Sequence, residues 1–310
     1  MCNFPLSFFR FYDGTSKICG TGVTEYLYKG VVYKDPLKVP CGKCIECRLN
    51  YARQWSFRLQ AEMLYHEHNS FITLTYDDNN VPLSESGNLT LRKSDFQKFI
   101  KRLRKNTGLD ISFYACCEYG EHTFRPHYHA IIFGWLPDDL VFNRTNKFGN
   151  VLYTSLTLQK LWPFGFSLIS EANVRTGGYC ARYCTKKLTG SSAVLAYDNL
   201  GIERPRSLMS RRPAIGYQYF LDHIDDIISY DKLSISTSDG VLTISPPKYF
   251  YDKLQLTYPD LYANLKERKE DISRCLDTLP DLSTYDIDFL NYYHEELSEI
   301  RSCALKRGDI

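Results

Sequence analysis

The chain has 310 residues, enough for one large domain or two smaller ones, and its 44% hydrophobic and 24% charged content excludes intrinsic disorder over most of its length. No apolar run approaches the roughly 18 residues of a membrane span, and the first residues lack the basic start and apolar stretch of a signal peptide. These features predict a cytoplasmic protein without a membrane partner, whose 11 cysteines bind metal or are buried rather than forming disulfides.

The net charge of +2 conceals an uneven distribution along the chain. Residues 217–310 contain 10 basic and 18 acidic residues, a net charge of −8, whereas residues 1–216 contain the other 28 basic and 18 acidic residues, a net charge of +10. A basic segment of this size is typical of proteins that bind the phosphate backbone of nucleic acid. A solvated surface has the same composition, so charge alone leaves both interpretations open.

The first third of the chain is predicted to contain short strands and then two helices. Glycines and a proline divide residues 1–40 into aromatic and β-branched strands, and apolar residues at helical spacing predict a helix over 51–65. Alternation predicts a strand over 71–76. The capping box Ser94 to Gln97 predicts the start of a second helix that reaches residue 105 and is basic on its outer face.

Strands and helices alternate irregularly in the rest of the chain. Strands are expected over 111–118, 127–133 and 166–169, and helices over 154–161 and 179–188, the last beginning after Gly177 and Gly178. The acidic remainder contains a hairpin and three helices, expected over 233–244, 249–256, 258–275 and 285–305. This order predicts an α+β fold with a central antiparallel sheet flanked by helices, and a mostly helical C-terminal extension.

Two histidines are the first candidates for chemistry. His127 and His129 are two residues apart on a predicted strand, so both side chains lie on one face of the sheet and could bind a divalent ion. Glu118, on the preceding strand, could supply a carboxylate beside them, or Glu121 if that strand ends earlier. A structural histidine pair is the alternative.

Two tyrosines are the second candidates. Tyr179 and Tyr183 are four residues apart, and Lys187 follows after another four, so two phenols and an ammonium could share one helix face. Such phenols could be nucleophiles that form a phosphodiester intermediate. In a chain with 24 tyrosines, an amphipathic helix with tyrosine as filler fits the same pattern.

A cysteine run could bind zinc. Cys41, Cys44 and Cys47 supply three thiolates at C-x₂-C-x₂-C spacing, and Cys2 or Cys19 could supply the fourth that structural zinc requires. An iron–sulfur cluster is not expected, because the bacterial ferredoxin run needs a fourth cysteine where this chain has Tyr51. The buried remainder is expected to include Cys116, Cys117, Cys180 and Cys184.

Three segments together resemble a known superfamily. The motifs FITLTY at 71–76, RPHYHAIIFG at 125–134 and YCARYCTKK at 179–187 occur in the order of the three motifs of HUH endonucleases, which initiate rolling-circle replication. The segment PCGKCIECR at 40–48 resembles the replication initiators of gokushoviruses, small single-stranded DNA phages of the Microviridae. The resemblance covers about residues 1–216 and extends loosely to 246–251. It implies a ferredoxin-like or RRM-like core over 51–216, with residues 1–50 packed on it and an acidic region over 217–310.

The resemblance also implies an activity. His127, His129 and Glu118 would bind Mg²⁺ or Mn²⁺, and Tyr179 and Tyr183 would attack the phosphorus of a single-stranded origin, leaving a 5′-phosphotyrosine and a free 3′-OH for a host polymerase. Basic residues would balance phosphate charge near the tyrosines or contact DNA: Lys186 and Lys187 for the first role, and Lys98, Lys101, Arg102, Lys105 and Arg182 for the second. A host helicase is expected as a partner because no G-x₄-G-K-[ST] loop is present. A relaxase or transposase of the superfamily, or a non-enzymatic, zinc-stabilised nucleic-acid-binding protein, are the alternatives.

Overall fold

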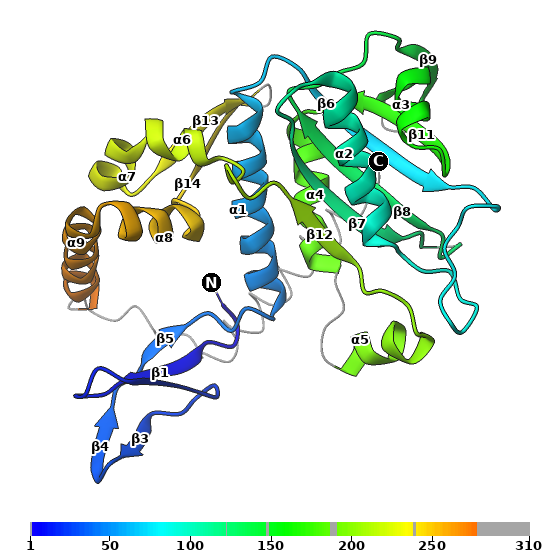
Figure 1. Ribbon diagram of the computed structural model, residues 1–310. Coiled ribbons are helices and arrows are strands. Elements are labelled where there is room, and N and C mark those ends of the chain that lie inside the picture. The colour runs from blue at the N-terminus through cyan, green and yellow to red at the C-terminus, as the bar shows by residue number, and fades with distance from the viewer. Residues whose placement is uncertain (1, 122, 147–148, 187–190, 238–239, 278–310) are drawn as a thin grey trace. The chain divides into compact units, whose positions relative to one another are not determined.

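The computed structural model of the chain describes residues 2–121, 123–146, 149–186, 191–237 and 240–277 (Figure 1). The chain divides into two compact units, one containing Met1–Tyr51 and the other containing Ala52–Arg274. Among the described residues no helix has the length and apolar character needed to cross a membrane.

The first unit is built from short strands. Strand β1 is the centre of an antiparallel sheet in the order β2-β1-β5, and β3 and β4 form a separate hairpin. Their bounds are Leu6–Arg10 for β1, Ser16–Cys19 for β2, Glu25–Tyr28 for β3, Val31–Lys34 for β4 and Leu37–Val39 for β5. The ring of Phe11 stacks on that of Tyr28, with centroids 4.0 Å apart.

The second unit contains a seven-stranded antiparallel sheet in the order β12-β7-β8-β6-β11-β10-β9 (Figure 1). The strands are β6 Asn69–Tyr76, β7 Ser112–Tyr119, β8 Pro126–Phe133, β9 Val141–Thr145, β10 Val151–Thr154, β11 Gly165–Glu171 and β12 Arg206–Met209. With helices α2 (Lys93–Thr107) and α4 (Val174–Lys186), strands β6, β7, β8 and β11 give the β-α-β-β-α-β arrangement of a ferredoxin-like core. The predicted α+β class is therefore confirmed.

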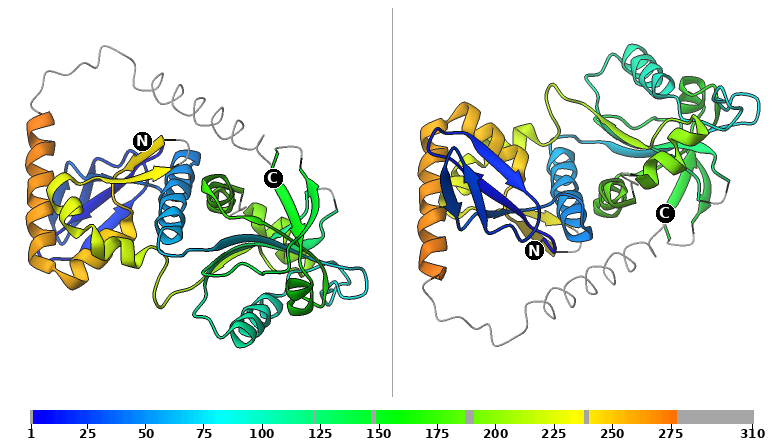
Figure 2. Two further views of the ribbon diagram at one scale, coloured as in Figure 1. Left: turned by 90° about the horizontal axis from the view of Figure 1, so that it is seen from above. Right: turned by 90° about the horizontal axis from the view of Figure 1, so that it is seen from below.

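Helices cover both faces of this sheet (Figure 2). On one face, Phe96, Phe99 and Leu103 of α2 and Leu158 of α3 (Leu156–Leu161) pack against Ile72 and other strand residues. On the opposite face, α4 and helix α1 (Ile45–Met63) contribute buried apolar side chains that pack on strands β6, β7 and β8: Trp55, Leu59, Cys180 and Ala181. Buried Cys116, Cys117 and Cys180 match the expectation for these cysteines, whereas the side chain of Cys184 lies outside the described residues.

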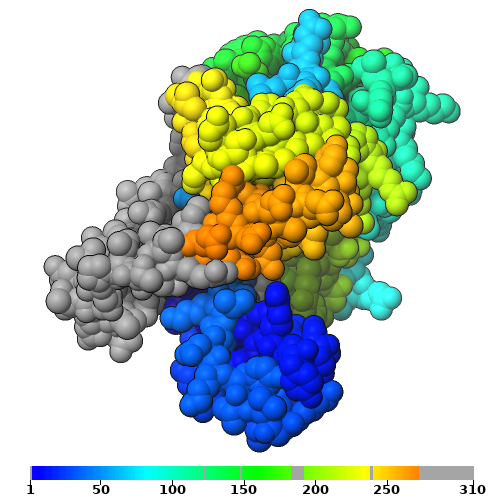
Figure 3. Space-filling view, turned by 90° about the vertical axis from the view of Figure 1, so that its left-hand side faces the viewer, coloured from blue at the N-terminus to red at the C-terminus, as the bar shows by residue number. Residues whose placement is uncertain are grey.

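The C-terminal part of the second unit has its own core. Phe57 and Ala61 of α1 pack with Phe220, Ile235 and Phe250 from the later elements. These elements are α5 Ser191–Ala196, α6 Tyr217–Asp222, α7 Ile224–Tyr230, β13 Leu233–Thr237, β14 Gly240–Ile244, α8 Lys248–Thr257 and α9 Pro259–Asp277. Strands β13 and β14 form the predicted hairpin, and Figure 3 shows α8 and α9 in orange beside α6 and α7 in yellow. The helix expected over 285–305 lies outside the described residues.

Two predicted helix starts were wrong. Helix α2 begins after Arg92, whose backbone N–H and carbonyl both pair with the Tyr128 hydroxyl, so Ser94 lies inside the first turn and no side chain caps the helix. Helix α4 begins at Val174, because the side chain of Asn173 accepts hydrogen bonds from the backbone N–H groups two and three residues later. The glycines expected before this helix therefore lie within it.

Candidate active site and metal centres

Sheet register brings the predicted metal ligands together. Glu118 of β7 pairs directly with His127 of β8, and His129 lies two residues further along the same strand. Residues directly opposite in an antiparallel pair project to the same face, so all three side chains lie on the face that α4 also covers. Glu121 lies beyond the end of β7 and is not part of this group.

The three side chains form a compact group. The Oε1 atom of Glu118 lies 3.3 Å from Nε2 of His127 and 3.0 Å from Nε2 of His129. Glu118 is only 4% exposed and His129 only 8%. Burial raises the pKa of Glu118, but hydrogen bonds and charge from the two imidazoles outweigh burial and lower this pKa to about 2. The carboxylate is therefore ionised and available as a ligand.

The outer nitrogens of the imidazoles fix how the inner ones face Glu118. The Nδ1 atom of His127 lies 3.0 Å from the carbonyl oxygen of Arg125, which can only accept, so Nδ1 carries the hydrogen. Nδ1 of His129 lies 2.9 Å from the hydroxyl of Thr73. In a neutral imidazole this leaves the Nε2 lone pair directed at the carboxylate, which is repulsive unless a proton or a cation lies between them.

This donor set fits a divalent cation. It combines imidazoles, which first-row ions accept, with a carboxylate, which Mg²⁺ and Mn²⁺ prefer. The ligand atoms of the three residues all lie within 4.8 Å of one another. Three protein ligands leave coordination positions open for the oxygens of a substrate.

Tyr179 lies at the edge of this group. Its hydroxyl donates to Oε1 of Glu118 at 3.3 Å, and its ring packs edge-on against His129 with centroids 5.1 Å apart. Burial raises the pKa of Tyr179 well above its usual value, and the charge of Glu118 raises it further. Before a cation compensates the carboxylate, the phenol is therefore protonated and a weak nucleophile.

The other predicted residues of this helix are less fully described. Tyr183 lies one turn after Tyr179 in α4, and Lys186 is the last residue of the helix, but their side chains are outside the described residues. Lys187 is itself outside them. The helical spacing of the two tyrosines is present in the backbone, and the roles of all three residues stay predictions.

The predicted DNA contacts of α2 lie away from the metal-ligand group. Lys98, Lys101 and Lys105 are exposed on a helix that covers the sheet face opposite to His127 and His129, and Arg102 donates to the carbonyl of Leu161. Arg182 is half-buried in α4, on the face that carries the histidines. A role of these five residues in DNA binding stays a prediction.

Sequence reasoning missed three residues around the site. Thr73 lies opposite His129 in β6 and bonds its Nδ1 atom, and the ring of Phe71 stacks on the His129 ring with centroids 5.5 Å apart. Phe166 lies opposite Thr75 in β11, in the same row as His127, and is 68% exposed. Only the alternation of residues 71–76 signalled the first two, since their partners depend on strand pairing.

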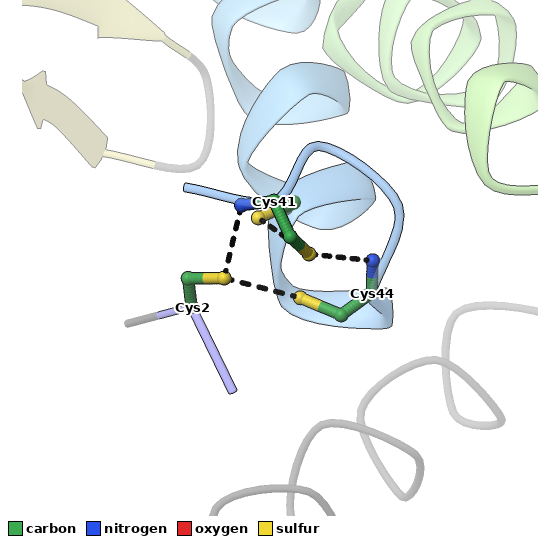
Figure 4. Close-up of side chains that lie close together, drawn as sticks. Cys2, Cys41 and Cys44 are labelled. Atoms are coloured by element: carbon green, nitrogen blue, oxygen red, sulfur yellow. Dashed lines mark hydrogen bonds between the residues drawn. The ribbon is translucent and has the colours of Figure 1, made fainter. Parts of the chain in front are cut away.

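A second metal-ligating group lies in the first unit. The Sγ atoms of Cys2, Cys41, Cys44 and Cys47 all lie within 4.8 Å of one another, as Figure 4 shows for three of these residues. Cys19, the other candidate for a fourth ligand, is not part of the group.

The comparisons with known proteins agree with this geometry in one region. The family model of the ORF2 type of replication-associated protein matches residues 69–188, which contain Glu118, His127, His129 and Tyr179. The chain is 34% identical over 243 residues to replication-associated protein ORF2 of Spiroplasma virus 4, covering 76% of this chain and 74% of that protein.

Two further relatives are more distant. Replication-associated protein VP4 of Bdellovibrio phage phiMH2K is 29% identical over 266 residues, covering 82% of this chain and 80% of its own. Replication-associated protein ORF4 of Chlamydia phage 1 is 29% identical over 225 residues, covering 70% of this chain and 53% of its own. No solved structure matches the chain.

Proposed function

Because the chain belongs to the family of replication-associated proteins of small phages, we propose that it acts in rolling-circle replication by cutting and rejoining single-stranded DNA through a tyrosine. The observation that carries the proposal is one cluster of side chains. Two imidazoles, a buried carboxylate and a phenol meet within hydrogen-bond distance on one sheet face.

The proposed reaction exchanges one phosphodiester for another. The phenol oxygen of Tyr179 or Tyr183 attacks the phosphorus of the DNA backbone, a new P–O(Tyr) bond forms, and the bond from phosphorus to the 3′ oxygen breaks. The departing 3′ oxygen takes up a proton, so that the phenolic proton lost is balanced. The products are a 5′-phosphotyrosine and a free 3′-OH, and attack by a 3′-OH on the phosphotyrosine reverses the step.

Each protein group has a distinct part in this reaction. His127, His129 and Glu118 would hold Mg²⁺ or Mn²⁺, which would polarise the scissile phosphate when bound. Thr73 and the Arg125 carbonyl orient the imidazoles through their Nδ1 atoms. A phosphate oxygen that enters the group faces no buried lysine among the described residues around Glu118, so cation charge would have to compensate it.

A second phenol one helical turn away suits a replication cycle. While Tyr179 or Tyr183 holds the first 5′ end, the other can cut the regenerated origin, and the released 3′-OH can close a unit-length circle. A host polymerase would extend the 3′-OH, and a host helicase would unwind the duplex. A relaxase or transposase would share the chemistry but would not depend on a phage origin.

The test is a covalent adduct. Single-stranded oligonucleotides tiled across the cognate phage genome, labelled at the 5′ or 3′ end, are incubated with the full chain and Mn²⁺ or EDTA, and resolved on denaturing protein gels. We expect a metal-dependent adduct that retains the 3′-side fragment. Tyr179→Phe and Tyr183→Phe together should abolish it, whereas Tyr230→Phe, which alters an exposed phenol of α7, should not.

Two outcomes would contradict the proposal. An adduct that survives the double substitution would exclude these tyrosines as nucleophiles. Binding of DNA without an adduct for any tile or metal would favour a non-enzymatic binding protein, in which the histidines and tyrosines are structural.

A further inference from the structure

The four cysteines of the first unit have the geometry of a tetrahedral site. The Sγ atoms of Cys2 and Cys44 are 3.8 Å apart, and those of Cys41 and Cys47 are 4.0 Å apart. A tetrahedron with Zn–S bonds of about 2.3 Å has sulfur atoms about 3.8 Å apart. The same separations are nearly twice the S–S bond of a disulfide, about 2.05 Å.

Backbone groups around the cluster support thiolates. The N–H groups of Lys43 and Cys44 lie 3.5 and 3.4 Å from Sγ of Cys41, and the N–H of Cys41 lies 3.3 Å from Sγ of Cys2 (Figure 4). Such N–H···S contacts offset the negative charge of metal-bound thiolates and orient them. The tight loop 41–44 and the first turn of α1 thus direct three sulfurs to one point, and Cys2 approaches from 39 residues away.

The first unit also lacks the hydrophobic core that would stabilise it otherwise. Among the described residues 2–51, only two apolar side chains are buried, Phe9 at 2% and Phe11 at 6% exposure. Segments this small rarely fold on core burial alone, and disulfides or a structural metal commonly supply what is missing.

We propose that Cys2, Cys41, Cys44 and Cys47 bind one structural Zn²⁺ that folds the first unit. Four thiolates in a closed tetrahedral set favour zinc and leave no open position for catalysis. The ion ties the segment containing β1 to β5 closed at both ends, because one ligand precedes β1 and the other three follow β5. This site is separate from the residues of the proposed nuclease and does not depend on that activity.

The test measures metal in the full-length protein purified under reducing conditions with zinc. We expect one zinc per chain that resists dialysis, with an X-ray absorption spectrum of four sulfur neighbours at about 2.3 Å. Cys47→Ser should lose this zinc and expose residues 2–51 to protease. Cys19→Ser alters a half-buried cysteine of the same unit outside the group, so it should keep the zinc, and His129→Ala should keep it too.

Other results would overturn the proposal. Protein that contains no zinc, iron with acid-labile sulfide in its place, or zinc with nitrogen and oxygen neighbours would each exclude a four-thiolate zinc site. If Cys47→Ser keeps both the zinc and the protease resistance of wild type, the cysteines are not the ligands.

A different observation carries a second inference, which rests on the proposed nuclease function. The register places four residues in one row across strands β7, β8, β6 and β11: Glu118, His127, Thr75 and Phe166. Phe166 lies two strands from His127, about 10 Å at the usual strand spacing. An exposed phenylalanine beside a phosphate-binding group is suited to stack on a base, since every base presents a π-face.

We infer that Phe166 is a stacking platform for a base that lies a few nucleotides from the scissile phosphate. Phe142 of β9 provides a matched control, because it is 62% exposed but pairs through Tyr153, Ile169 and Ile72 with the opposite face of the sheet. Loss of one base–aromatic stack typically costs about 1–3 kcal/mol, which is about 5- to 150-fold in affinity.

Binding of a fluorescent single-stranded oligonucleotide is measured in EDTA, using the tile that wild type cuts in Mn²⁺. Phe166→Ala should weaken binding by about 5- to 150-fold, Phe166→Trp should restore it, and Phe142→Ala should leave it unchanged. If wild type cuts the tile and Phe166→Ala binds it as tightly as wild type, the platform is wrong and the nuclease stands. If wild type cuts no tile, the proposed function itself fails.

Discussion

Replacing Thr73 with valine tests whether the strand next to the histidines orients them for metal. The Thr73 hydroxyl lies 2.9 Å from Nδ1 of His129, and valine keeps the shape of the side chain but cannot accept the Nδ1 hydrogen. The ring would then be free to change tautomer, so that Nε2 carries the hydrogen and loses its lone pair for the cation. Substitutions of this kind typically weaken metal binding by about 10- to 100-fold, or about 1.4–2.7 kcal/mol.

The assay is a Mn²⁺ titration followed by calorimetry, with the metal dependence of adduct formation as a second readout. Thr73→Val should shift both midpoints to higher Mn²⁺ by the same factor, while the adduct level at saturating metal changes little. Thr75→Val is the matched control, because Thr75 lies on the same strand and face and is also half-buried, but no hydrogen bond among the described residues joins its hydroxyl to a histidine. Equal Mn²⁺ affinity of Thr73→Val and wild type would refute the reasoning.

Three further predictions concern stability. Arg58 is buried between the rings of Trp55 and Tyr249, at 4.1 and 4.0 Å, and donates two hydrogen bonds to a backbone carbonyl, so Arg58→Ala should lower the free energy of unfolding by about 3–5 kcal/mol in urea titrations; a loss under about 1 kcal/mol would mean that these contacts contribute little. Asn173→Ala should cost about 1–2 kcal/mol in the same titrations, because two backbone N–H groups lose their acceptor, whereas Asn173→Asp should retain most of the stability. Mn²⁺ at 100 times its dissociation constant should stabilise the folded chain by about 2.7 kcal/mol, raising Tm by about 5–11 °C in calorimetry, and Glu118→Gln should abolish this shift.

What could be predicted from the sequence depended on local patterns. The strand over 71–76 and the spacing of His127 and His129 were readable because alternation is a property of consecutive residues. The start of α2 was not, since the Tyr128 hydroxyl that pairs with Arg92 comes from a strand 36 residues later. The start of α4 did have a local signal, the Asn173 cap, which the glycine pair obscured.

The candidate site shows the same division. Its residue types could be predicted from spacing and resemblance, and Glu118 followed once the two strands were assumed to pair. The roles of Thr73 and Phe166 could not be predicted, because each depends on the register of a strand that is distant in sequence. Cys2 could be proposed but not chosen over Cys19, because a ligand 39 residues away leaves no periodic signal.

The hydrophobic core explains why the metal-ligand group has a fixed geometry. Along β8 the residues Tyr128, Ala130 and Ile132 face the core beneath α2, while the alternate positions face α4 and include the two histidines. A slip of one residue would move the imidazoles into the apolar core and the aromatic and aliphatic side chains out of it. The strand cannot make that exchange without losing both layers of packing. The same apolar side chains that stabilise the sheet therefore hold His127 and His129 opposite Glu118, while the contacts to the Nδ1 atoms set the orientation of the two rings.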